Sequence, residues 1–479
     1  MKLTASAAVG LSVAEVGDGA RACVPQVRRS VDMVNKTVIR DFIAGLHGSV
    51  LRRADQAYES ARRVWNAKFD RFPGLIVRCA NTTDVKRAID FARTENLLIA
   101  VRGGGHSFAG HSSCDGGLVI DLSRMKGLQI DAQRHMVRAQ PGLLGNELDV
   151  ATQQAAGLAM VLGGCGSVGV GGFTVGGGEG ALSGKYGLSC DNLLSAEVVL
   201  ADGRVVTASA DKHGDLFWAL RGGGGNFGVV TSFQFRAYPL TQVIAGRLIY
   251  DITQARAVMR AYRAFAPSAP DELTAGFTFS LSKDGPVLRL QAVYAGGEAS
   301  AAPVIAALRK LAKAKADTIT PVSYLAFKNA DPGPPPGFPS TVRTAFLAEL
   351  PDEAIDAISE VGAQIPRAAE IEMFHLHGAV SRVSLESSAF PLRQPGFDCF
   401  AAAAWLAPGQ RQAVSGWVQR FWKAVRPHAS GAYTNMLSDD EGDRVKDAYG
   451  RQYARLAALK KRYDPHNLFR LNPNILPAA

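Results

Sequence analysis

Two nucleophilic side chains of this chain lie inside glycine-rich runs. His106 follows Arg102-Gly-Gly-Gly, and Cys165 follows two glycines and begins a second run that extends to Gly180. Glycine lets a backbone approach a bulky ligand closely and adopt positive φ, and successive amides can converge on an anion such as a pyrophosphate. An imidazole and a thiol on such loops are nucleophiles. The sequence therefore predicts a cofactor that is held, covalently, from two sides.

Acid–base chemistry has a second candidate segment at residues 371–380. If this segment is a strand, its period of two places His375 and His377 on one face and Glu372 on the other. Histidine titrates in the range that a general base needs near neutral pH. A hydrogen-bonded structural pair of histidines is the alternative interpretation. Glu179, inside the second glycine run, is interpreted only as a capping carboxylate.

The elements that must position these residues form two mixed regions. The apolar residues 97–101 predict a buried strand that ends in the first glycine loop. Strand-like and helical runs alternate from residue 75 to residue 239, which is typical of an α+β domain. A second α+β region follows, and then a charged helix at residues 439–463 that ends at Asp464-Pro465. The predicted units are an N-terminal arm at 1–34, expected to be disordered or processed, a domain at 35–240, a domain at 241–430 and a segment at 431–479 that docks back.

Composition limits the classes of function. The 479 residues are 47% hydrophobic and carry a formal net charge of +10. The basic residues are scattered over separate amphipathic segments, which favours solvated helix faces over a nucleic-acid surface. The six cysteines lack the spacing of a disulfide scaffold or a zinc site, so no metal is expected. No run is long enough to cross a membrane, and Glu15 interrupts the short apolar N-terminal stretch, so we expect a cytoplasmic protein, with export as the alternative.

A third glycine run imitates a nucleotide-binding motif. Gly223, Gly225 and Gly228 satisfy the dinucleotide pattern, which requires a helix directly after the glycines. The residues that follow, 229–235, are β-branched and aromatic and predict a strand. A Rossmann site is therefore not expected here.

Several ordered motifs together resemble one family. They are Arg102-Gly-Gly-Gly-His106-Ser, Cys165-x-x-Val168-Gly169-x-Gly-Gly with Gly176-Gly177-Gly178, Lys185-Tyr-Gly-Leu188 with Asp191-Asn192, the segment from Asp215 to Thr231, Tyr433-Thr-Asn435, and the segment from Tyr463 to Ile475. The chain resembles the berberine bridge enzyme-like FAD-linked oxidases, a branch of the vanillyl-alcohol oxidase superfamily, over about residues 40–479. The resemblance implies a two-part PCMH-type FAD-binding domain, an α+β substrate domain with an antiparallel sheet, and a C-terminal segment that returns to the FAD domain.

The resemblance also implies the cofactor and its ligands. In this family the loop histidine bonds to the C8 methyl group of the flavin and the loop cysteine bonds to a neighbouring ring carbon, which are His106 and Cys165 here. Bicovalently bound FAD is therefore expected. The further residues expected at the flavin are Arg102, Gly103, Gly104, Gly105, Ser107, Gly164, Val168, Gly169, Gly172, Gly176, Gly177, Asp191, Asn192, Gly228, Val229, Tyr433 and Asn435.

The chain departs from the family at the expected catalytic base. Family members often carry Tyr-x-Asn-Tyr, in which the second tyrosine takes the substrate proton, whereas this chain has Met436 there. The candidate catalytic residues are therefore Tyr433, His375 and His377. Val168 resembles the oxidases at the oxygen-reacting face of the flavin.

The predicted function is that of an FAD-linked oxidase. Hydride passes from a hydroxyl- or amine-bearing small molecule (a sugar, an alcohol or a phenolic or other secondary metabolite) to the flavin, and O2 reoxidises the flavin to give H2O2. The alternatives are a dehydrogenase or oxidative cyclase of secondary metabolism with another electron acceptor, and a flavin-binding protein that has lost catalysis. The expected partners are the substrate and O2, with neither nucleic acid nor membrane, and the sequence does not indicate an oligomeric state.

Overall fold

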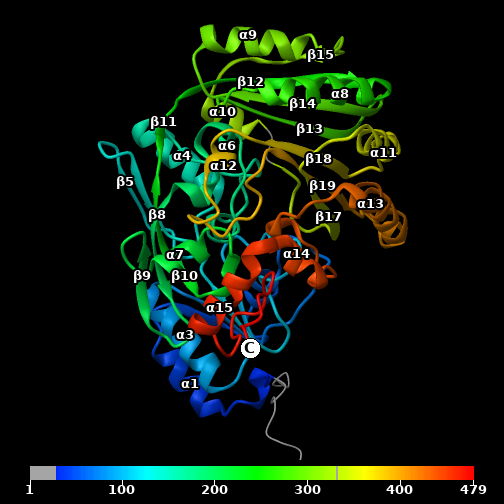
Figure 1. Cartoon of the computed structure of the whole chain (residues 1–479). Helices are drawn as coiled ribbons and strands as arrows, with labels where there is room; N and C mark the ends of the chain where they lie inside the picture. The colour runs from blue at the N-terminus through cyan, green and yellow to red at the C-terminus, as the bar shows by residue number, and fades with distance from the viewer. Residues whose placement is uncertain (1–27, 331–332) are drawn as a thin grey trace, which may run out of the picture.

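The computed structural model describes residues 28–330 and 333–479 (Figure 1). The chain begins with a small sheet in the order β1-β2-β4-β3, in which β2, β4 and β3 are parallel. Buried apolar runs form these strands, as expected for a parallel arrangement. The elements of this part are α1 (Lys36–Ala44), β1 (Ser49–Leu51), α2 (Tyr58–Arg62), β2 (Leu75–Arg78), α3 (Thr82–Thr94), β3 (Ile99–Arg102) and β4 (Leu118–Asp121).

A second, five-stranded sheet is antiparallel and has the order β5-β6-β10-β8-β9. Asp202-Gly203 forms the hairpin turn between β8 and β9, where Gly203 has φ of 84°. The elements are β5 (Leu128–Asp131), β6 (Met136–Ala139), α4 (Gly145–Ala156), β7 (Leu158–Ala159), α5 (Val170–Val175), α6 (Ser183–Tyr186), β8 (Leu193–Val199), β9 (Val205–Ser209), α7 (Gly214–Leu220), β10 (Val229–Arg236) and β11 (Tyr238–Pro239).

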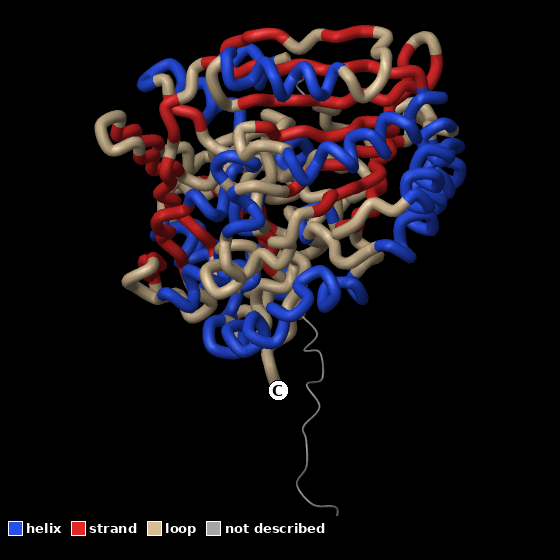
Figure 2. Tube along the Cα trace, turned by 45° about the horizontal axis from the view of Figure 1, so that its top comes forward, coloured by secondary structure: helices blue, strands red, loops and turns tan. Residues whose placement is uncertain are grey.

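The third sheet is eight-stranded and antiparallel, with the order β15-β12-β14-β13-β18-β19-β17 and β16 beside β12. Helices α8, α11 and α13 cover one face, and they share a core with the alternate apolar residues of the strands (Figure 2). The other face turns toward the first two sheets. The elements are β12 (Gln242–Asp251), α8 (Ala255–Phe265), β13 (Leu273–Ser282), β14 (Gly285–Tyr294), α9 (Glu298–Arg309), β15 (Ala316–Asp317), β16 (Thr320–Ser323), α10 (Tyr324–Asn329), β17 (Ser340–Leu347), α11 (Asp352–Ala363), β18 (Ala369–Leu376), α12 (Ala379–Arg382), β19 (Gly396–Ala404) and α13 (Arg411–Val425).

The C-terminal segment returns to the first half of the chain. Helices α14 (Val445–Tyr449) and α15 (Tyr453–Tyr463) share a core with α7 and β10. Asn226, from the third glycine run, donates to the Pro473 carbonyl at 3.0 Å and accepts from the Ile475 amide at 3.0 Å. The buried Lys460 ammonium donates to the Asn226 carbonyl at 2.8 Å. The third glycine run is thus a turn that leads into strand β10 and anchors the tail.

The predicted fold class is confirmed, and three local expectations are corrected. The charged helix predicted at 439–463 is divided, because Gly450 adopts φ of 52° between α14 and α15. The apolar spacing over residues 35–69 predicts helix with an interruption at Gly48, but the structure places the short strand β1 directly after that glycine. Residues 28–34 of the predicted arm are packed, since Val31 is 4% exposed and the Arg29 amide donates to the Asn96 carbonyl. Residues 1–27 lie outside the described residues, and the division at residues 34, 240 and 430 stays our proposal.

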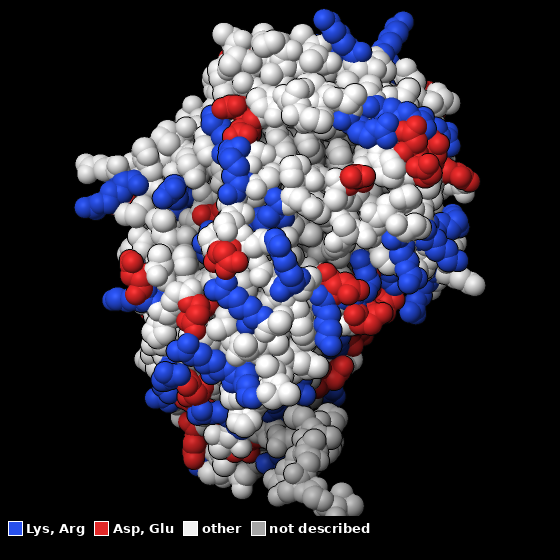
Figure 3. All heavy atoms as spheres, in the orientation of Figure 1, with Lys and Arg blue, Asp and Glu red and all other residues white. Residues whose placement is uncertain are grey.

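The surface carries both signs of charge. On the face in Figure 3, Lys and Arg side chains are interspersed with Asp and Glu side chains. Within the described ranges, no helix has the length and apolar character needed to cross a membrane.

Candidate active site

The two glycine loops touch each other through their backbones. A Cβ atom on Gly169 would lie 2.2 Å from the Gly104 amide nitrogen, and one on Gly104 would lie 2.5 Å from the Gly169 nitrogen. The second loop is further fixed to α4, because the Gly145 amide donates to the Val168 carbonyl at 2.9 Å. Glycine is therefore required where the loops meet, and the contact brings His106 and Cys165 to one place.

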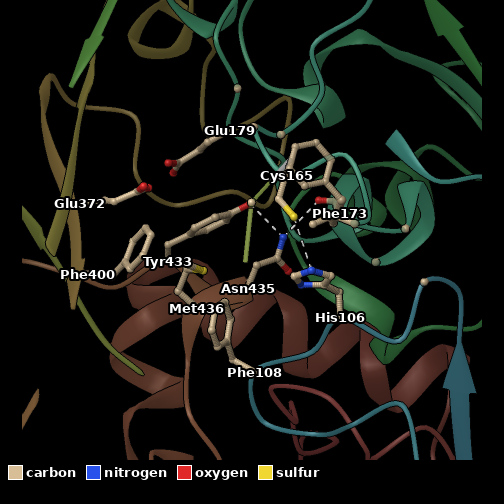
Figure 4. A pocket seen from close by; sticks show the side chains of 18 of the residues that line it. His106, Phe108, Cys165, Phe173, Glu179, Glu372, Phe400, Tyr433, Asn435 and Met436 are labelled. Carbon is tan, nitrogen blue, oxygen red and sulfur yellow. Dashed lines mark hydrogen bonds between the residues drawn. The ribbon is translucent and has the colours of Figure 1, made fainter. Parts of the chain in front are cut away.

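The imidazole of His106 and the thiol of Cys165 converge (Figure 4). The Cys165 sulfur lies 3.7 Å from His106 Nε2 and 3.1 Å from the Ser167 hydroxyl. The Trp65 ring stacks on the His106 ring, with centroids 4.3 Å apart. Burial lowers the pKa of His106 to about 4, so the imidazole is neutral at physiological pH and keeps a lone pair for bond formation.

A loop from the sheet side covers this pair of nucleophiles. A Cβ atom on Gly333 would lie 2.7 Å from the Cys165 sulfur. The Trp65 indole donates to the Pro334 carbonyl at 3.4 Å, and the Gly337 amide donates to the Trp65 carbonyl at 3.1 Å. Residues 333–337 thus pack directly over the side chains that would bond to a ligand.

Both glycine loops open into a cavity of about 1120 Å³ between the first two sheets and the large third sheet. Its volume is above the usual range for small-molecule sites, which suits a dinucleotide cofactor together with a substrate. Gly164, Gly172 and Gly225 line it, and a Cβ atom on any of them would meet no other atom within 4 Å. The bare backbone therefore leaves room for a large planar ligand, and the residues fit FAD.

Most of the predicted flavin-binding residues line this cavity. They are Gly103, Gly104, Gly105, His106, Ser107, Gly164, Cys165, Val168, Gly169, Gly172, Gly228, Val229, Tyr433 and Asn435. These positions come from both glycine loops, from the start of β10 and from the C-terminal segment. They remain our proposed cofactor contacts.

Three polar or charged predicted residues support the loops from behind instead of lining the cavity. The buried Arg102 guanidinium donates to the Ala61 and Ser112 carbonyls. Asp191 accepts two hydrogen bonds from Arg393, at 2.7 and 2.8 Å. Asn192 accepts from the Tyr238 hydroxyl at 2.6 Å. The side chains of Asp191 and Asn192 are used in holding the protein together, so we correct their assignment from cofactor contacts to supports. Arg102 keeps one buried nitrogen, Nη2, without a partner among the described residues, so its assignment to the cofactor stays a prediction.

Gly176 and Gly177 also act as supports. A Cβ atom on Gly176 would lie 2.0 Å from the Asn435 amide oxygen, and one on Gly177 would lie 2.7 Å from the Phe390 ring. Gly177 has φ of 127°, which favours glycine. These glycines let the C-terminal segment approach the second loop closely.

The contact between the C-terminal segment and the second glycine loop holds Tyr433 at the cavity. Its hydroxyl oxygen accepts from the Gly178 amide at 2.9 Å and from the Asn435 amide group at 2.9 Å (Figure 4). Burial is the largest cause that raises the pKa of Tyr433, and the neighbouring Glu179 raises it further. The phenol therefore keeps its proton at neutral pH and acts as a fixed polar group. Met436, where the family has tyrosine, also lines the cavity.

The two candidate histidines face away from the cavity, which corrects their predicted role. As expected, they share one strand face with Glu372 on the other, but their face is the one that packs under the helices. The Tyr262 hydroxyl of α8 lies 3.1 Å from His375 Nδ1, and His377 Nε2 lies 2.8 Å from the Leu273 carbonyl. Burial lowers the pKa of His375 to about 3 and lowers that of His377. They form the stacked structural pair of the alternative interpretation, with centroids 4.4 Å apart.

The opposite face of the same strands carries side chains whose position at the cavity the sequence alone did not indicate. Glu372 and Phe374 of β18, and Asp398 and Phe400 of β19, line the cavity. Asp398 is 1% exposed and pairs in register with Phe374 on one side and with Phe346 on the other. The alternation in strand β18 was visible in the sequence, but the buried run 396–404 showed no face that could mark Asp398.

Glu179 also points into the cavity, from the second glycine run (Figure 4). Its Oε1 atom and the Oδ1 atom of Asp398 are buried without a hydrogen-bond partner among the described residues. Burial raises the pKa of Asp398 to about 7, and burial together with the Asp398 charge raises that of Glu179 well above its ordinary value. Interpreting Glu179 as a cap is therefore wrong. It forms a carboxyl pair with Asp398.

The fold and the cavity together define a flavin-dependent oxidoreductase. Residues 73–209 match the family model described as an FAD binding domain, and residues 432–476 match the one described as berberine and berberine like. The uncharacterized FAD-linked oxidoreductase YgaK of Bacillus subtilis is 30% identical over 443 residues, which cover 90% of this chain and 97% of that protein.

Two further proteins agree with this result. The (R)-6-hydroxynicotine oxidase of Paenarthrobacter nicotinovorans is 29% identical, over 90% of this chain and 97% of its own. The solved structure of wild-type BBE-like 1 from Physcomitrella patens superposes with a TM-score of 0.84 at 25% identity, covering 92% of this chain and 99% of that one. The chain belongs to the berberine bridge enzyme-like FAD-linked oxidoreductases.

Proposed function

We propose that this FAD-linked oxidoreductase is an oxidase whose flavin is bonded to both His106 and Cys165. The observation that carries the attachment is the 3.7 Å distance between the imidazole nitrogen and the sulfur at the edge of the cavity. A neutral imidazole supports it, because only the unprotonated nitrogen can form the bond. The bound flavin would supply the acceptor for a hydride and the route by which two electrons reach O2.

The proposed substrate is a small molecule that carries a hydroxyl or an amine. The cavity wall opposite the glycine loops combines aromatic rings with carboxyl groups, namely Phe374, Phe400, Glu372 and Asp398. Rings can cover a flat organic substrate, while a carboxylate can take the proton of its O–H or N–H group. The relative from Paenarthrobacter nicotinovorans, named for 6-hydroxynicotine, supports this substrate range.

Asp398 is the proposed proton acceptor. It is the buried carboxyl group of the sheet wall, and its pKa of about 7 suits a base that works near neutral pH. Tyr433 orients the substrate or the flavin with its fixed hydroxyl group. The Asp398 carboxylate therefore takes the place of the tyrosine that Met436 removes.

Val168 supports O2 as the electron acceptor. It lies in the second glycine loop and lines the cavity three residues after Cys165. A small aliphatic side chain at this position leaves more room for O2 than a bulkier one does. The released product would then be H2O2.

Two measurements test the proposal. The mass of the acid-denatured protein should include one FAD in the wild type and in each of the single variants His106→Ala and Cys165→Ala, and none in the double variant. Reduced protein mixed with O2 in a stopped-flow instrument should reoxidise rapidly. Absence of flavin mass from the wild type would refute the covalent attachment, and slow reoxidation would favour a dehydrogenase.

A further inference from the structure

The carboxyl pair of Glu179 and Asp398 joins two parts of the chain that are far apart in sequence. Glu179 comes from the second glycine run, and Asp398 comes from strand β19 of the large sheet. Both line the same cavity, and each has one buried oxygen without a hydrogen-bond partner among the described residues. A buried carboxyl group must be paired or must carry a proton, because an isolated buried charge is strongly unfavourable.

No cation in the described part of the chain is among the groups that shift the pKa of Glu179 or Asp398. The cations that line the cavity lie elsewhere: Arg289 and Arg247 are on β14 and β12, three and four strands from β19 in the large sheet, and Lys328 faces Asp149. The charges of both carboxyl groups raise the pKa of the Tyr433 hydroxyl. Within the sheet, Phe374 and Phe346 flank Asp398, and the adjacent Cys399 points to the opposite, helix-covered face. Glu372, the next carboxyl group of the wall, adds no positive charge. Two carboxylates in such a place cannot both be ionised, so they share a proton at neutral pH.

We propose that Glu179 is a positioning residue that remains a neutral carboxylic acid and donates a hydrogen bond to the Asp398 carboxylate, which takes the substrate proton. This inference rests on the proposed function. Glu179 is assigned the shared proton because Asp398 lies on the sheet wall beside the aromatic rings Phe374 and Phe400, where it can reach the substrate, whereas Glu179 comes from the glycine run. The Tyr433 hydroxyl already accepts two N–H donors and lies beside Glu179.

The proton and the electron pair are balanced in this scheme. The substrate would lose its O–H or N–H proton to Asp398 as its C=O or C=N bond forms, and the bound flavin would supply the acceptor for the hydride of the adjacent C–H bond. Asp398 becomes a carboxylic acid and later releases the proton to water. Glu179 keeps its own proton throughout, so it sets the basicity of Asp398 without being consumed.

The pH dependence of substrate oxidation tests the role of Glu179. Anaerobic flavin reduction is measured against pH in wild type, Glu179→Gln, Glu179→Leu and Asp398→Asn. The wild-type rate should fall as pH drops through about 7. Glu179→Gln should keep this midpoint because its amide still donates to Asp398, whereas Glu179→Leu should raise the midpoint by about one pH unit or more. Glu386→Gln, on a side chain that is 89% exposed, is the matched control and should leave the profile unchanged.

Two outcomes would overturn the proposal. If Glu179→Gln is as slow as Asp398→Asn, Glu179 itself accepts the proton. If Glu179→Leu keeps the wild-type midpoint, its role is only structural. Infrared spectroscopy gives a readout without substrate. Above about pH 8, wild type and Asp398→Asn should show a carboxylic-acid carbonyl band, and Glu179→Gln should lack it. Absence of this band from the wild-type spectrum would also refute the proposal. Failure of every substrate to reduce the wild type would instead count against the proposed function.

Discussion

The two walls of the cavity are built in opposite ways. The wall with the glycine loops is largely backbone, in which glycines such as Gly104 and Gly169 meet without side chains and place His106 and Cys165 at the cavity. The large sheet presents side chains on every second residue, and the residues between them hold the helices. A backbone wall tolerates almost no substitution, whereas the cavity face of a sheet can change without touching the core behind it. In the proposed function, the cofactor is therefore held mainly by one wall and the substrate mainly by the other.

A buried ion pair connects the two walls. Lys328 of α10, on the sheet side, lies 3.4 Å from Asp149 of α4 and donates to the Leu162 and Gly163 carbonyls just before Cys165. Lys328 is 8% exposed and Asp149 is 1% exposed. This lysine therefore fixes the second glycine loop relative to the sheet.

Removing the proposed base from the sheet wall should have the largest effect, and the effect should be on the rate of flavin reduction. Asp398→Asn replaces the carboxylate with an amide of the same shape, so flavin reduction should slow by about 10²–10⁴-fold. The flavin absorbance per protein should stay at the wild-type level, because Asp398 belongs to the sheet wall. Rapid-mixing spectroscopy measures both, and a rate within about threefold of wild type would show that the sheet wall does not hold the base.

Breaking the ion pair between the walls should have the next largest effect, and this effect should be on the free energy of unfolding. Lys328→Met leaves the Asp149 carboxylate buried without its cation, which should lower the free energy of unfolding by about 3–5 kcal/mol. The double variant Lys328→Met with Asp149→Asn should recover part of this loss because it removes the stranded charge. Urea unfolding measures the difference, and equal stability of the single and double variants would argue against a buried pair.

Adding one methyl group to the backbone wall should have a smaller effect on stability. Gly169→Ala places a Cβ atom against the Gly104 amide, so we expect about 1–3 kcal/mol of destabilisation and less covalently bound flavin. Gly416→Ala in α13 is the matched control, since a Cβ atom there meets nothing within 4 Å. Thermal unfolding and intact mass should separate the two variants, and equal behaviour would show that the loops can move apart.

Changing the hidden face of the sheet should have the smallest effect. His375→Gln should leave flavin reduction within about twofold and cost about 1 kcal/mol at neutral pH through its contact with Tyr262. The pKa of His375 is lowered from 6.5 to about 3, so its contribution to stability is complete above pH 6.5 and is lost as pH falls toward 3. The free energy of unfolding should therefore differ less between pH 7 and pH 5 in His375→Gln than in wild type. A large loss of rate would return His375 to the list of catalytic candidates.

The backbone wall was more predictable than the sheet wall. Consecutive glycines around His106 and Cys165 have few structural explanations, so their types and spacing alone indicated a ligand. The period of two correctly separated His375 from Glu372, but it could not say which face the helices cover, because that depends on α8, α11 and α13 folding back from distant parts of the chain. Asp398 was missed since the run around it is almost uniformly buried.

One wrong helix boundary and two wrong site residues have identifiable causes. The helix predicted over residues 439–463 followed its charge pattern, but Gly450 takes a positive φ that ends α14. Asp191 and Asn192 were predicted as flavin contacts from the resemblance alone. Their partners, Arg393 and Tyr238, lie 202 and 46 residues away in sequence, and no local pattern shows such pairings.

The position of Tyr433 has a consequence for synthesis of the protein. Its hydroxyl closes the cavity by bonding to Gly178, which precedes it by 255 residues. At a translation rate of about 5–20 residues per second, the ribosome needs roughly 13–50 s to travel between them. During that interval the nascent glycine loops have emerged but lack their final neighbour. We therefore expect the flavin to be bonded only after most of the chain has left the ribosome, so that an interrupted translation product would carry no coloured cofactor.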